Sequence, residues 1–250
     1  MPRPRALLRV AIAHAVGASL LATAPAAPAA PSAEPARRAD PVVGSCYRLT
    51  GPEIWADSHS DPPVDCGVTH NALTVAVVTL PAETDWDDEE YLWKKVGPPC
   101  YRALDATLGR TARARAMSAY GLVWFQPTSQ ERADGASWVR CDAVLWEGRS
   151  GAPIPDASPL LEQPLTNQVA RCLAGNRFYV VRCAQQHTFR ATGVARVRFA
   201  SYPGDRAALR YARRQCPSRV ASVRWRYSYP SKTAWKVGHR LLVCYTKTRR

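Results

Sequence analysis

The sequence lacks the short motifs that mark several large classes of enzyme. Its 250 residues contain no G-x-S-x-G nucleophile turn, no phosphate-binding P-loop and no G-x-G-x-x-G dinucleotide fingerprint. The usual sequence evidence for an α/β-hydrolase, a P-loop nucleotide hydrolase or a dinucleotide-dependent oxidoreductase is therefore missing, and we expect no cofactor. An acidic run at residues 85–90 lacks the spaced oxygen ligands and central glycine of an EF-hand, so we interpret it as a solvated first turn of a helix.

Long apolar runs are missing beyond the N-terminus. Arg3, Arg5 and Arg9 precede a mostly apolar stretch and then small residues, which is the layout of a secretory signal peptide. No later segment approaches the ~20 apolar residues that a membrane-spanning helix needs. We therefore expect residues 1–30 to be a signal peptide, residues 31–40 to be a linker, and the mature chain to work outside the cytoplasm without a membrane span. An uncleaved N-terminal anchor is the alternative.

Acidic residues are nearly absent from the second half of the chain. Residues 168–250 contain 19 Lys+Arg and a single acid, Asp205, a net charge of +18, whereas residues 41–167 contain 10 Lys+Arg and 17 Asp+Glu, a net charge of −7. This asymmetry predicts a polyanionic partner for the second half, or attraction between the halves. Lysine is scarce too, since 29 of the 34 basic residues are Arg. An ordinary solvated face in an Arg-rich sequence is therefore the competing explanation.

Cysteine, by contrast, is abundant, and its spacing repeats. The eight cysteines form two sets of four: Cys46, Cys66, Cys100 and Cys141, then Cys172, Cys183, Cys216 and Cys244. Each set contains a Cys-x3-His step, which ends at His70 in the first set and at His187 in the second. Each set also has a glycine six residues before its last cysteine, Gly135 or Gly238. A repeated cysteine frame predicts two small domains of the same build.

We place the first domain at residues 41–148, acidic and more divergent, and the second at residues 169–250, basic, with a proline-rich linker at 149–168. Apolar and alternating segments predict strands in both domains. These strands cover residues 73–80, 120–125 and 138–146, then 178–183, 188–199, 222–229 and 240–246. The predicted fold class is α+β: two disulfide-stapled modules, each an antiparallel sheet with one helix packed on a face.

Charges and prolines locate the helices. In the first module, Thr84 or Asp85 is the expected cap of a helix that ends at residues 97–99 (Gly-Pro-Pro), and a second helical stretch follows to residue 108. In the second module, Asp205 is the expected cap of a helix of roughly twelve residues that ends at Cys216.

An oxidising compartment makes disulfides the expected state of the cysteines. We favour a nested pairing within each module: Cys46–Cys141 with Cys66–Cys100, and Cys172–Cys244 with Cys183–Cys216. A zinc site or a Cys–His nucleophile is the alternative, but the other cysteines are isolated and none is spare. We therefore assign no metal site. His70 and His187 receive a structural role, in which an imidazole N–H bonds a backbone carbonyl.

The second module offers a candidate anion-binding face. Side chains over residues 189–199 alternate between apolar and basic, and residues 224–229 alternate in the same way. Five arginines are expected to lie side by side on neighbouring strands: Arg190, Arg196, Arg198, Arg224 and Arg226. Outside the cytoplasm the expected anions are phospholipid headgroups and wall polymers, and nucleic acid is not expected as a partner.

The pattern of the second module resembles a known family. Its frame consists of Cys172, Val180-Val181-Arg182-Cys183, His187, Tyr202-Pro203, Cys216, Pro230, Trp235-Lys236-Val237-Gly238-His239-Arg240 and Cys244. This frame is similar to the septum-formation domain of actinobacterial envelope proteins. The first module resembles the same domain less closely, through Cys46, Cys66, His70, Cys100, Gln126-Pro127-Thr128, Gly135 and Cys141. The resemblance implies two tandem copies beyond a signal or anchor and a link to cell division, and it brings no catalytic residue.

We therefore expect a non-enzymatic, secreted binding or scaffolding protein of the cell envelope. Its partner is expected to be an envelope protein, an anionic envelope polymer or a lipid surface. The alternative is an extracytoplasmic hydrolase or metal-dependent enzyme that uses the acidic residues of the first module and the repeated histidines.

Overall fold

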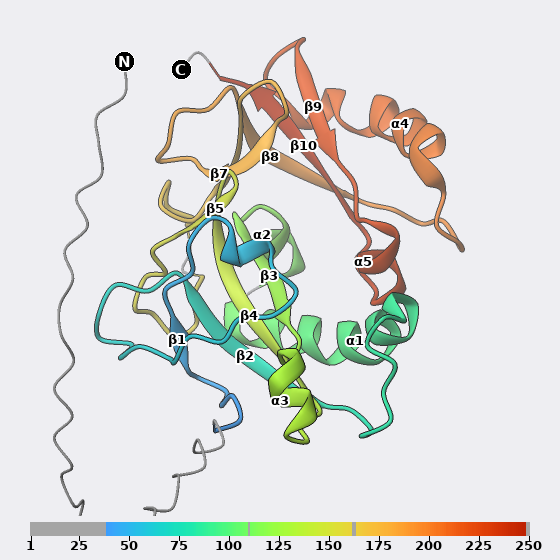
Figure 1. Ribbon diagram of the computed structural model, residues 1–250. Helices are drawn as coiled ribbons and strands as arrows, with labels where there is room; N and C mark the ends of the chain where they lie inside the picture. The colour runs from blue at the N-terminus through green and yellow to red at the C-terminus, as the bar shows by residue number, and fades with distance from the viewer. Residues whose placement is uncertain (1–38, 110, 162–163, 249–250) are drawn as a thin grey trace, which may run out of the picture. The chain divides into compact units, whose positions relative to one another are not determined.

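The computed structural model describes residues 39–109, 111–161 and 164–248, which all belong to one compact unit. The predicted signal peptide and most of the predicted linker at 31–40 lie outside these residues. Two five-stranded antiparallel sheets organise the described part of the chain (Figure 1). The mixed helix and strand content and the antiparallel sheets confirm the predicted fold class.

The first sheet has the strand order β1-β2-β4-β3, and β5 pairs with β4. Its strands are β1 (Cys46–Tyr47), β2 (Ala72–Thr79), β3 (Tyr120–Phe125), β4 (Trp138–Glu147) and β5 (Ser150–Ala152). The second sheet has the order β7-β6-β8-β10-β9. Its strands are β6 (Arg171–Ala174), β7 (Tyr179–Arg182), β8 (Phe189–Arg196), β9 (Trp225–Ser228) and β10 (Leu241–Lys247).

Both sheets follow the same path along the chain. Four strands of each sheet have the same order, β1-β2-β4-β3 in the first and β6-β8-β10-β9 in the second, and β5 and β7 are the additional strands. A long helix follows β2 in the first sheet and β8 in the second, and a short helix precedes β4 in the first sheet and β10 in the second. These helices are α1 (Glu89–Leu108) and α3 (Ser129–Ala133), then α4 (Gly204–Gln215) and α5 (Lys232–Lys236). The cysteine repeat therefore corresponds to a repeated arrangement of elements.

The helix α1 is a single helix of 20 residues and not the two helices predicted. The Gly-Pro-Pro segment at 97–99 does not end it, although a proline inside a helix costs about 3 kcal/mol. One buried stripe continues through the prolines and packs on the first sheet: Leu92, Val96, Cys100, Leu104 and Leu108. Burial of these side chains against the sheet offsets the lost backbone hydrogen bonds.

The predicted helix caps are also corrected. The N-cap of α1 is Asp88 and not Thr84 or Asp85, and the Asp88 carboxylate accepts a backbone N–H at 2.9 Å. The N-cap position of α4 is Pro203, which offers no side-chain bond. Asp205 lies in the first turn of that helix, where its charge still suits the helix dipole.

All eight cysteines form disulfides, as the sequence predicts, but the nested pairing is wrong. The four bonds join Cys46 to Cys66, Cys100 to Cys141, Cys172 to Cys183, and Cys216 to Cys244. The pairing is therefore sequential within each half, and it is the same in both halves.

Strand register explains the sequential pairing. Cys46 lies opposite Val64 in an antiparallel bridge, and Cys172 lies opposite Val181 in the β6–β7 hairpin. The second cysteine of each half stands two residues beyond that partner, so the returning chain brings it back beside the first cysteine. The third cysteine of each half faces the sheet from the helix or its C-terminal end. The cysteine beneath it is the fourth, which lies on β4 or β10.

The described part of residues 149–168, predicted as a linker, packs against the first sheet in the structure. The strand β5 lies within this segment and pairs with β4. Ile154, Leu160 and Leu161 are buried in the core that α1 also fills. The segment thus adds to the core of the first half before the chain enters the second sheet.

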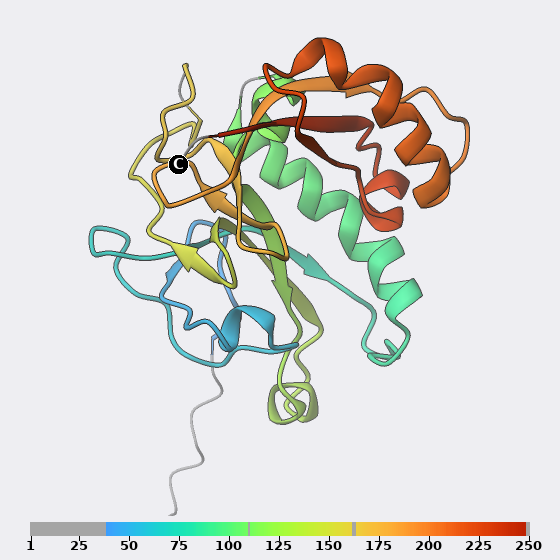
Figure 2. The same cartoon turned by 90° about the horizontal axis from the view of Figure 1, so that it is seen from above.

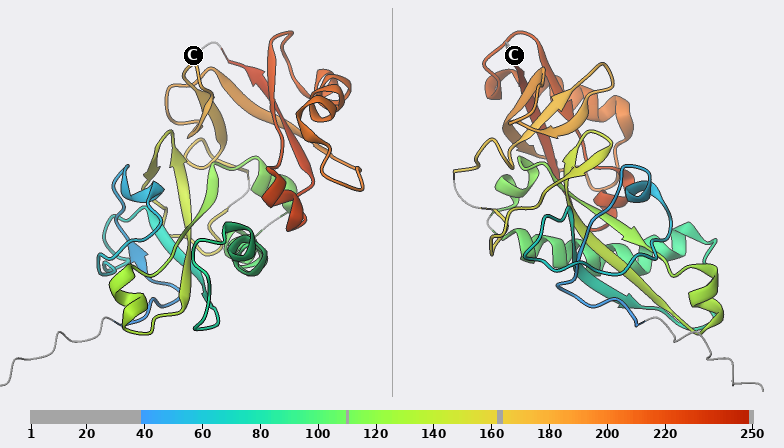
Figure 3. Two further views of the ribbon diagram at one scale, coloured as in Figure 1. Left: turned by 45° about the vertical axis from the view of Figure 1, so that its right-hand side comes forward. Right: turned by 60° about the vertical axis from the view of Figure 1, so that its left-hand side comes forward.

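Each sheet is covered by a long helix on one face and by a connecting segment or a short helix on the opposite face. Figure 2 shows α1 and α4 from above, and the left view of Figure 3 shows each nearly end on beside its own sheet. The segment between β1 and β2 covers the opposite face of the first sheet, where Ile54 packs near Phe125. The opposite face of the second sheet receives α2 (Ala112–Ala116) and Met117, which lie against Tyr245.

Candidate functional site

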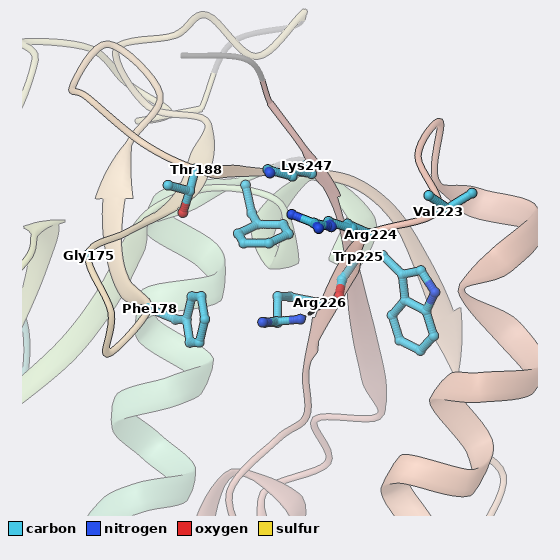
Figure 4. Close-up of a pocket in the computed structure, with 9 residues that line it drawn as sticks. Gly175, Phe178, Thr188, Val223, Arg224, Trp225, Arg226 and Lys247 are labelled. Atoms are coloured by element: carbon cyan, nitrogen blue, oxygen red, sulfur yellow. Dashed lines mark hydrogen bonds between the residues drawn. The ribbon is translucent and has the colours of Figure 1, made fainter.

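The second sheet holds a pocket of about 540 Å³, shown in Figure 4. The β6–β7 turn and the start of β8 form one side, and β9 with the end of β10 forms the other. Its lining includes Phe178, Thr188, Phe189, Arg224, Arg226 and Lys247, and we call these six residues the cationic pocket. The Trp225 ring points away from the pocket and packs in the α4 core, so Trp225 contributes its backbone.

A curled sheet makes the pocket possible. The turn before β7 and the strand β9 lie at opposite ends of the strand order, yet the Arg226 guanidinium carbon is 4.7 Å from the Phe178 ring centroid. The same guanidinium carbon lies 5.1 Å from the Phe189 ring centroid. Arg226 therefore makes cation–π contacts with two rings and joins the two ends of the sheet.

Phe178 has an unusual backbone conformation at the edge of this pocket. Its φ is 55°, and it is the only non-glycine residue of the described part of the chain with a positive φ. A bulky side chain in the left-handed region is strained. The Phe178 ring packs edge-on against Phe189 at 5.8 Å and under Arg226, and these contacts hold the strained turn in place.

The charged residues that line the pocket are all cations. Arg224, Arg226 and Lys247 are all exposed, and among the described residues no salt bridge reaches any of the three. The Arg226 side chain donates a hydrogen bond to the backbone carbonyl of Trp225 at 3.1 Å. Residues 168–250 contain one acidic side chain, Asp205, so this half of the sequence supplies few carboxylates that could neutralise these cations.

Part of the charge asymmetry is used inside the protein. Two salt bridges run from the acidic first half to the basic second half: Glu90 to Lys236 at 2.9 Å and Glu147 to Arg182 at 3.0 Å. The Lys236 ammonium lowers the pKa of Glu90, mainly through their hydrogen bond. Within the described part of the chain, attraction between the halves therefore engages Arg182 and Lys236 and none of the cations of the cationic pocket.

The five arginines of the predicted face do not lie side by side. On β10, Tyr245 is opposite both Ala191 and Arg226, while the next residue, Thr246, is opposite Arg190. Successive residues of a strand point to opposite faces, so Arg190 lies on the other face from Arg226. Arg190 also donates a hydrogen bond to the Asn167 side chain at 2.7 Å.

A β-bulge separates the remaining predicted arginines. The β8–β10 register shifts between Cys244 and Tyr245, so the strict alternation predicted along β8 is interrupted there. Arg196 lies opposite Leu241, four residues along β10 from the Arg226 row. Arg198 follows the end of β8 and is exposed. Of the predicted five, only Arg224 and Arg226 line the cationic pocket.

Sequence reasoning missed Lys247 and Phe178. The position of Lys247 beside Arg224 was predictable in principle from strand pairing. The Lys247 backbone N–H bonds the Arg224 carbonyl at 3.3 Å, and this pairing continues the β9–β10 ladder. The position of Phe178 in the pocket was not predictable, because an aromatic residue next to a turn is ordinarily assigned to the core. Its place in the pocket depends on how strongly the sheet curls.

The two repeated histidines have the same local contact. The Nδ1 atom of His70 lies 3.0 Å from the Val68 carbonyl oxygen, and Nδ1 of His187 lies 2.7 Å from the Gln185 carbonyl oxygen. Both rings are buried. Each imidazole thus closes the turn that follows the second cysteine of its half, two residues before the next strand begins.

The first half contains a buried cluster of polar side chains. The Arg140 guanidinium bonds the Asp142 carboxylate at 3.0 Å, and Thr74 donates its hydroxyl to the same carboxylate at 2.8 Å. Arg140 also stacks on the Tyr47 ring, with 3.7 Å between guanidinium carbon and ring centroid. Burial raises the pKa of Asp142, while Arg140 and Thr74 act in the opposite direction. His59 is buried beside Arg140.

His59 also belongs to a group that could approach a cation. One ligand atom each from Glu53, His59 and Asp61 lies within 4.8 Å of the others. However, the Arg140 guanidinium lies 3.2 Å from His59 Nδ1, where only a deprotonated nitrogen can accept its N–H. The fixed positive charge of Arg140 and its contact with Nδ1 both disfavour a metal ion at the histidine.

Comparison with known proteins identifies the relationship. The sequence profile of the family described as septum formation matches residues 100–244, more than half of the chain. The chain belongs to the septum formation family. The match runs from Cys100 in α1 to Cys244 in β10 and includes the cationic pocket except for Lys247. No curated protein and no solved structure matches the chain.

Membership of the septum formation family confirms the resemblance seen in the sequence. The single continuous match begins inside the first half, so it does not confirm two tandem family domains, and that detail stays a prediction. The family points to a role in cell division or the cell envelope. Four disulfides fit a location outside the cytoplasm. Within residues 39–248, as far as the structure describes them, no helix combines the length and apolarity that crossing a bilayer requires.

Proposed function

We propose that this member of the septum formation family is a non-enzymatic binding or scaffolding protein of the actinobacterial cell envelope, secreted by an N-terminal signal peptide. Its binding site is the cationic pocket, and its ligand is an anionic component of the envelope. The observation that carries the proposal is the group of three exposed cations on one pocket, Arg224, Arg226 and Lys247, none of which forms a salt bridge with another described residue.

The electrostatics of the second half support a binding role. Charged ligands are drawn to a region in which one sign of charge dominates, and residues 168–250 carry 19 basic residues against one acid. Arg226 is already ordered by Phe178 and Phe189, so its guanidinium is held in place before any ligand arrives. An ordered donor loses less side-chain entropy on binding than a free one.

The groups best suited to catalysis are engaged in holding the fold together. All eight cysteines are oxidised in disulfides, and the repeated histidines bond backbone carbonyls. Arg140 and Asp142 form a buried ion pair. These engagements favour a structural role for the repeated frame and a binding role for the protein's surface.

A metal-dependent enzyme centred on Glu53, His59 and Asp61 is the second candidate, because their ligand atoms lie close together. Equilibrium dialysis against Zn²⁺ and Mn²⁺ separates the two proposals. Tight binding that is lost in the Glu53→Gln, Asp61→Asn double variant would support the enzyme. We expect no saturable binding, because Arg140 occupies the histidine nitrogen that faces it.

The binding proposal is tested by co-sedimentation of the mature protein with isolated cell envelope at graded salt. We expect retention that weakens as the salt concentration rises, because exposed charges are screened. The Arg224→Glu, Arg226→Glu variant should be released at lower salt than the wild type. A matched control is Arg196→Glu, Arg198→Glu, which reverses two exposed arginines of the same half outside the pocket. Equal release of both variants would contradict the assignment of the pocket.

A further inference from the structure

Two apolar side chains stand at the mouth of the cationic pocket and are exposed to solvent. Val223 is 98% exposed, more than any other large hydrophobic residue of the described chain, and Phe178 is 37% exposed. Figure 4 shows Phe178 and Val223 on opposite sides of the pocket, with Arg224 and Lys247 between them. Single exposed apolar residues are common, but two that flank a cationic pocket form a pattern.

The turn that carries Val223 is fixed in shape. The Ser222 hydroxyl donates to the Arg224 carbonyl at 2.5 Å and accepts the Lys247 backbone N–H at 3.0 Å. The Ala221 N–H bonds the Thr246 hydroxyl at 3.1 Å. Three hydrogen bonds thus tie residues 221–224 together and to the end of β10, and the valine is held outward rather than free to fold back onto the sheet.

Phe178, the second of these two apolar tips, is also held in a fixed conformation, as Val223 is. Phe178 keeps a left-handed backbone conformation because its ring packs on Phe189 and under Arg226. The preceding residue, Arg177, is exposed and adds a further cation to the same turn. Each side of the pocket therefore presents an apolar side chain next to a basic one.

We infer that the cationic pocket and its two apolar tips form a docking surface for an anionic phospholipid bilayer. Lipid phosphates would meet Arg224, Arg226 and Lys247, while Val223 and Phe178 would enter the boundary between headgroups and acyl chains. Basic residues near an anionic membrane and apolar residues at its interface act together in peripheral binding. This inference rests on the proposed function and specifies its ligand.

The apolar tips favour a bilayer over a soluble polyanion. A wall polymer or polyphosphate would gain from the three cations but would leave Val223 in water. A bilayer supplies both the negative surface and an apolar layer within reach of a rigid tip. Substituting Val223 should therefore affect binding to vesicles and leave binding to a soluble polyanion unchanged.

The test measures dissociation constants for vesicles of phosphatidylglycerol and phosphatidylcholine, for pure phosphatidylcholine vesicles, and for polyphosphate. We expect binding to the anionic vesicles and not to the neutral ones. The Arg224→Gln, Lys247→Gln variant should lose about thirtyfold in vesicle affinity, at about fivefold for each cation near the surface. The Val223→Ser variant should lose about three- to tenfold for vesicles and nothing for polyphosphate.

A matched control is Val43→Ser, which removes another valine that is 58% exposed but lies in the first half. It should bind vesicles as the wild type does. The inference is overturned if Val223→Ser and Val43→Ser bind vesicles equally well, or if neutral vesicles bind as tightly as anionic ones. Binding to polyphosphate and cell wall alone would overturn the bilayer and leave the proposed function standing. Failure to bind any of these would overturn both.

Discussion

The Arg226 guanidinium carbon lies 4.7 Å from the Phe178 ring centroid, and this contact joins the two ends of the second sheet across a positively charged pocket. Phe178 makes it from a backbone with φ 55°, a conformation that glycine adopts without strain and other residues do not. We expect the free energy of unfolding of the Phe178→Gly variant to be about 1 kcal/mol higher than that of Phe178→Ala, so that the glycine variant is the more stable.

Both of these variants lose the ring, so their difference reports the backbone alone. Chemical denaturation of the two proteins measures it. Equal stability, or a more stable alanine variant, would show that the turn does not have a left-handed residue at position 178.

The disulfide pairing can be checked chemically. Proteolysis without reduction, followed by mass spectrometry, should find Cys46 linked to Cys66 and Cys100 linked to Cys141 in the first half. Removing the Cys100–Cys141 bond, which closes 41 residues, should cost about 4 kcal/mol by loop-closure entropy. Removing Cys172–Cys183, which closes 11 residues, should cost about 3 kcal/mol. A peptide that links Cys46 to Cys141 would contradict the sequential pairing.

The buried pair of Arg140 and Asp142 should matter far more for stability than an exposed pair. Asp142→Asn leaves the Arg140 charge buried without its counter-ion, and we expect a loss of about 3–5 kcal/mol in the free energy of unfolding. The matched control is Asp105→Asn, where the side chain is 35% exposed and the expected loss is about 1 kcal/mol or less. Similar losses in the two variants would mean that Asp142 is not enclosed as described.

A pH dependence follows from His239, whose ring lies against Tyr101 with 4.6 Å between centroids. Burial lowers the pKa of His239; Asp105 opposes this effect, while Arg115 and Arg240 add to it. The folded protein therefore favours the neutral ring. Stability should fall as the pH drops below the unfolded value of about 6.5, because the unfolded state binds the proton more readily.

Thermal unfolding between pH 7.5 and 5.5 measures this dependence, in a range that avoids most carboxylate titrations. The His239→Gln variant should lose the part of the pH dependence that His239 contributes. An unchanged pH profile in that variant would show that the histidine does not titrate differently in the folded and unfolded states.

Local patterns predicted most of the strands, because burial and alternation are visible in the sequence. The apolar run of β2 and the segments of β3 and β4 are close to their predicted bounds. The continuation of α1 through Pro98 and Pro99 was not predictable from local rules. There the tertiary gain of a buried stripe on the sheet exceeds the cost of two prolines.

The site was less predictable than the fold, because it depends on register and curvature. A one-residue shift near Cys244 breaks the alternation along β8, and the even-numbered arginines then no longer share a face. The approach of Phe178 to Arg226 depends on the curl of five strands. The positive charge of the second half is visible in the sequence. Which of its basic residues come together in a pocket depends on the register and curvature of the sheet.

If the cationic pocket binds an anionic envelope component, reversing two of its charges must weaken binding more than reversing two arginines elsewhere in the same half. The dissociation constant for anionic envelope material should be measured for the wild type, for Arg224→Glu, Arg226→Glu, and for Arg196→Glu, Arg198→Glu at the same salt concentration. Both variants have the same net charge, so only the position of the change differs. We predict a loss of about thirtyfold or more in the pocket variant and a much smaller loss in the control. Equal losses, or no loss in the pocket variant, would show that the cationic pocket is not the binding site.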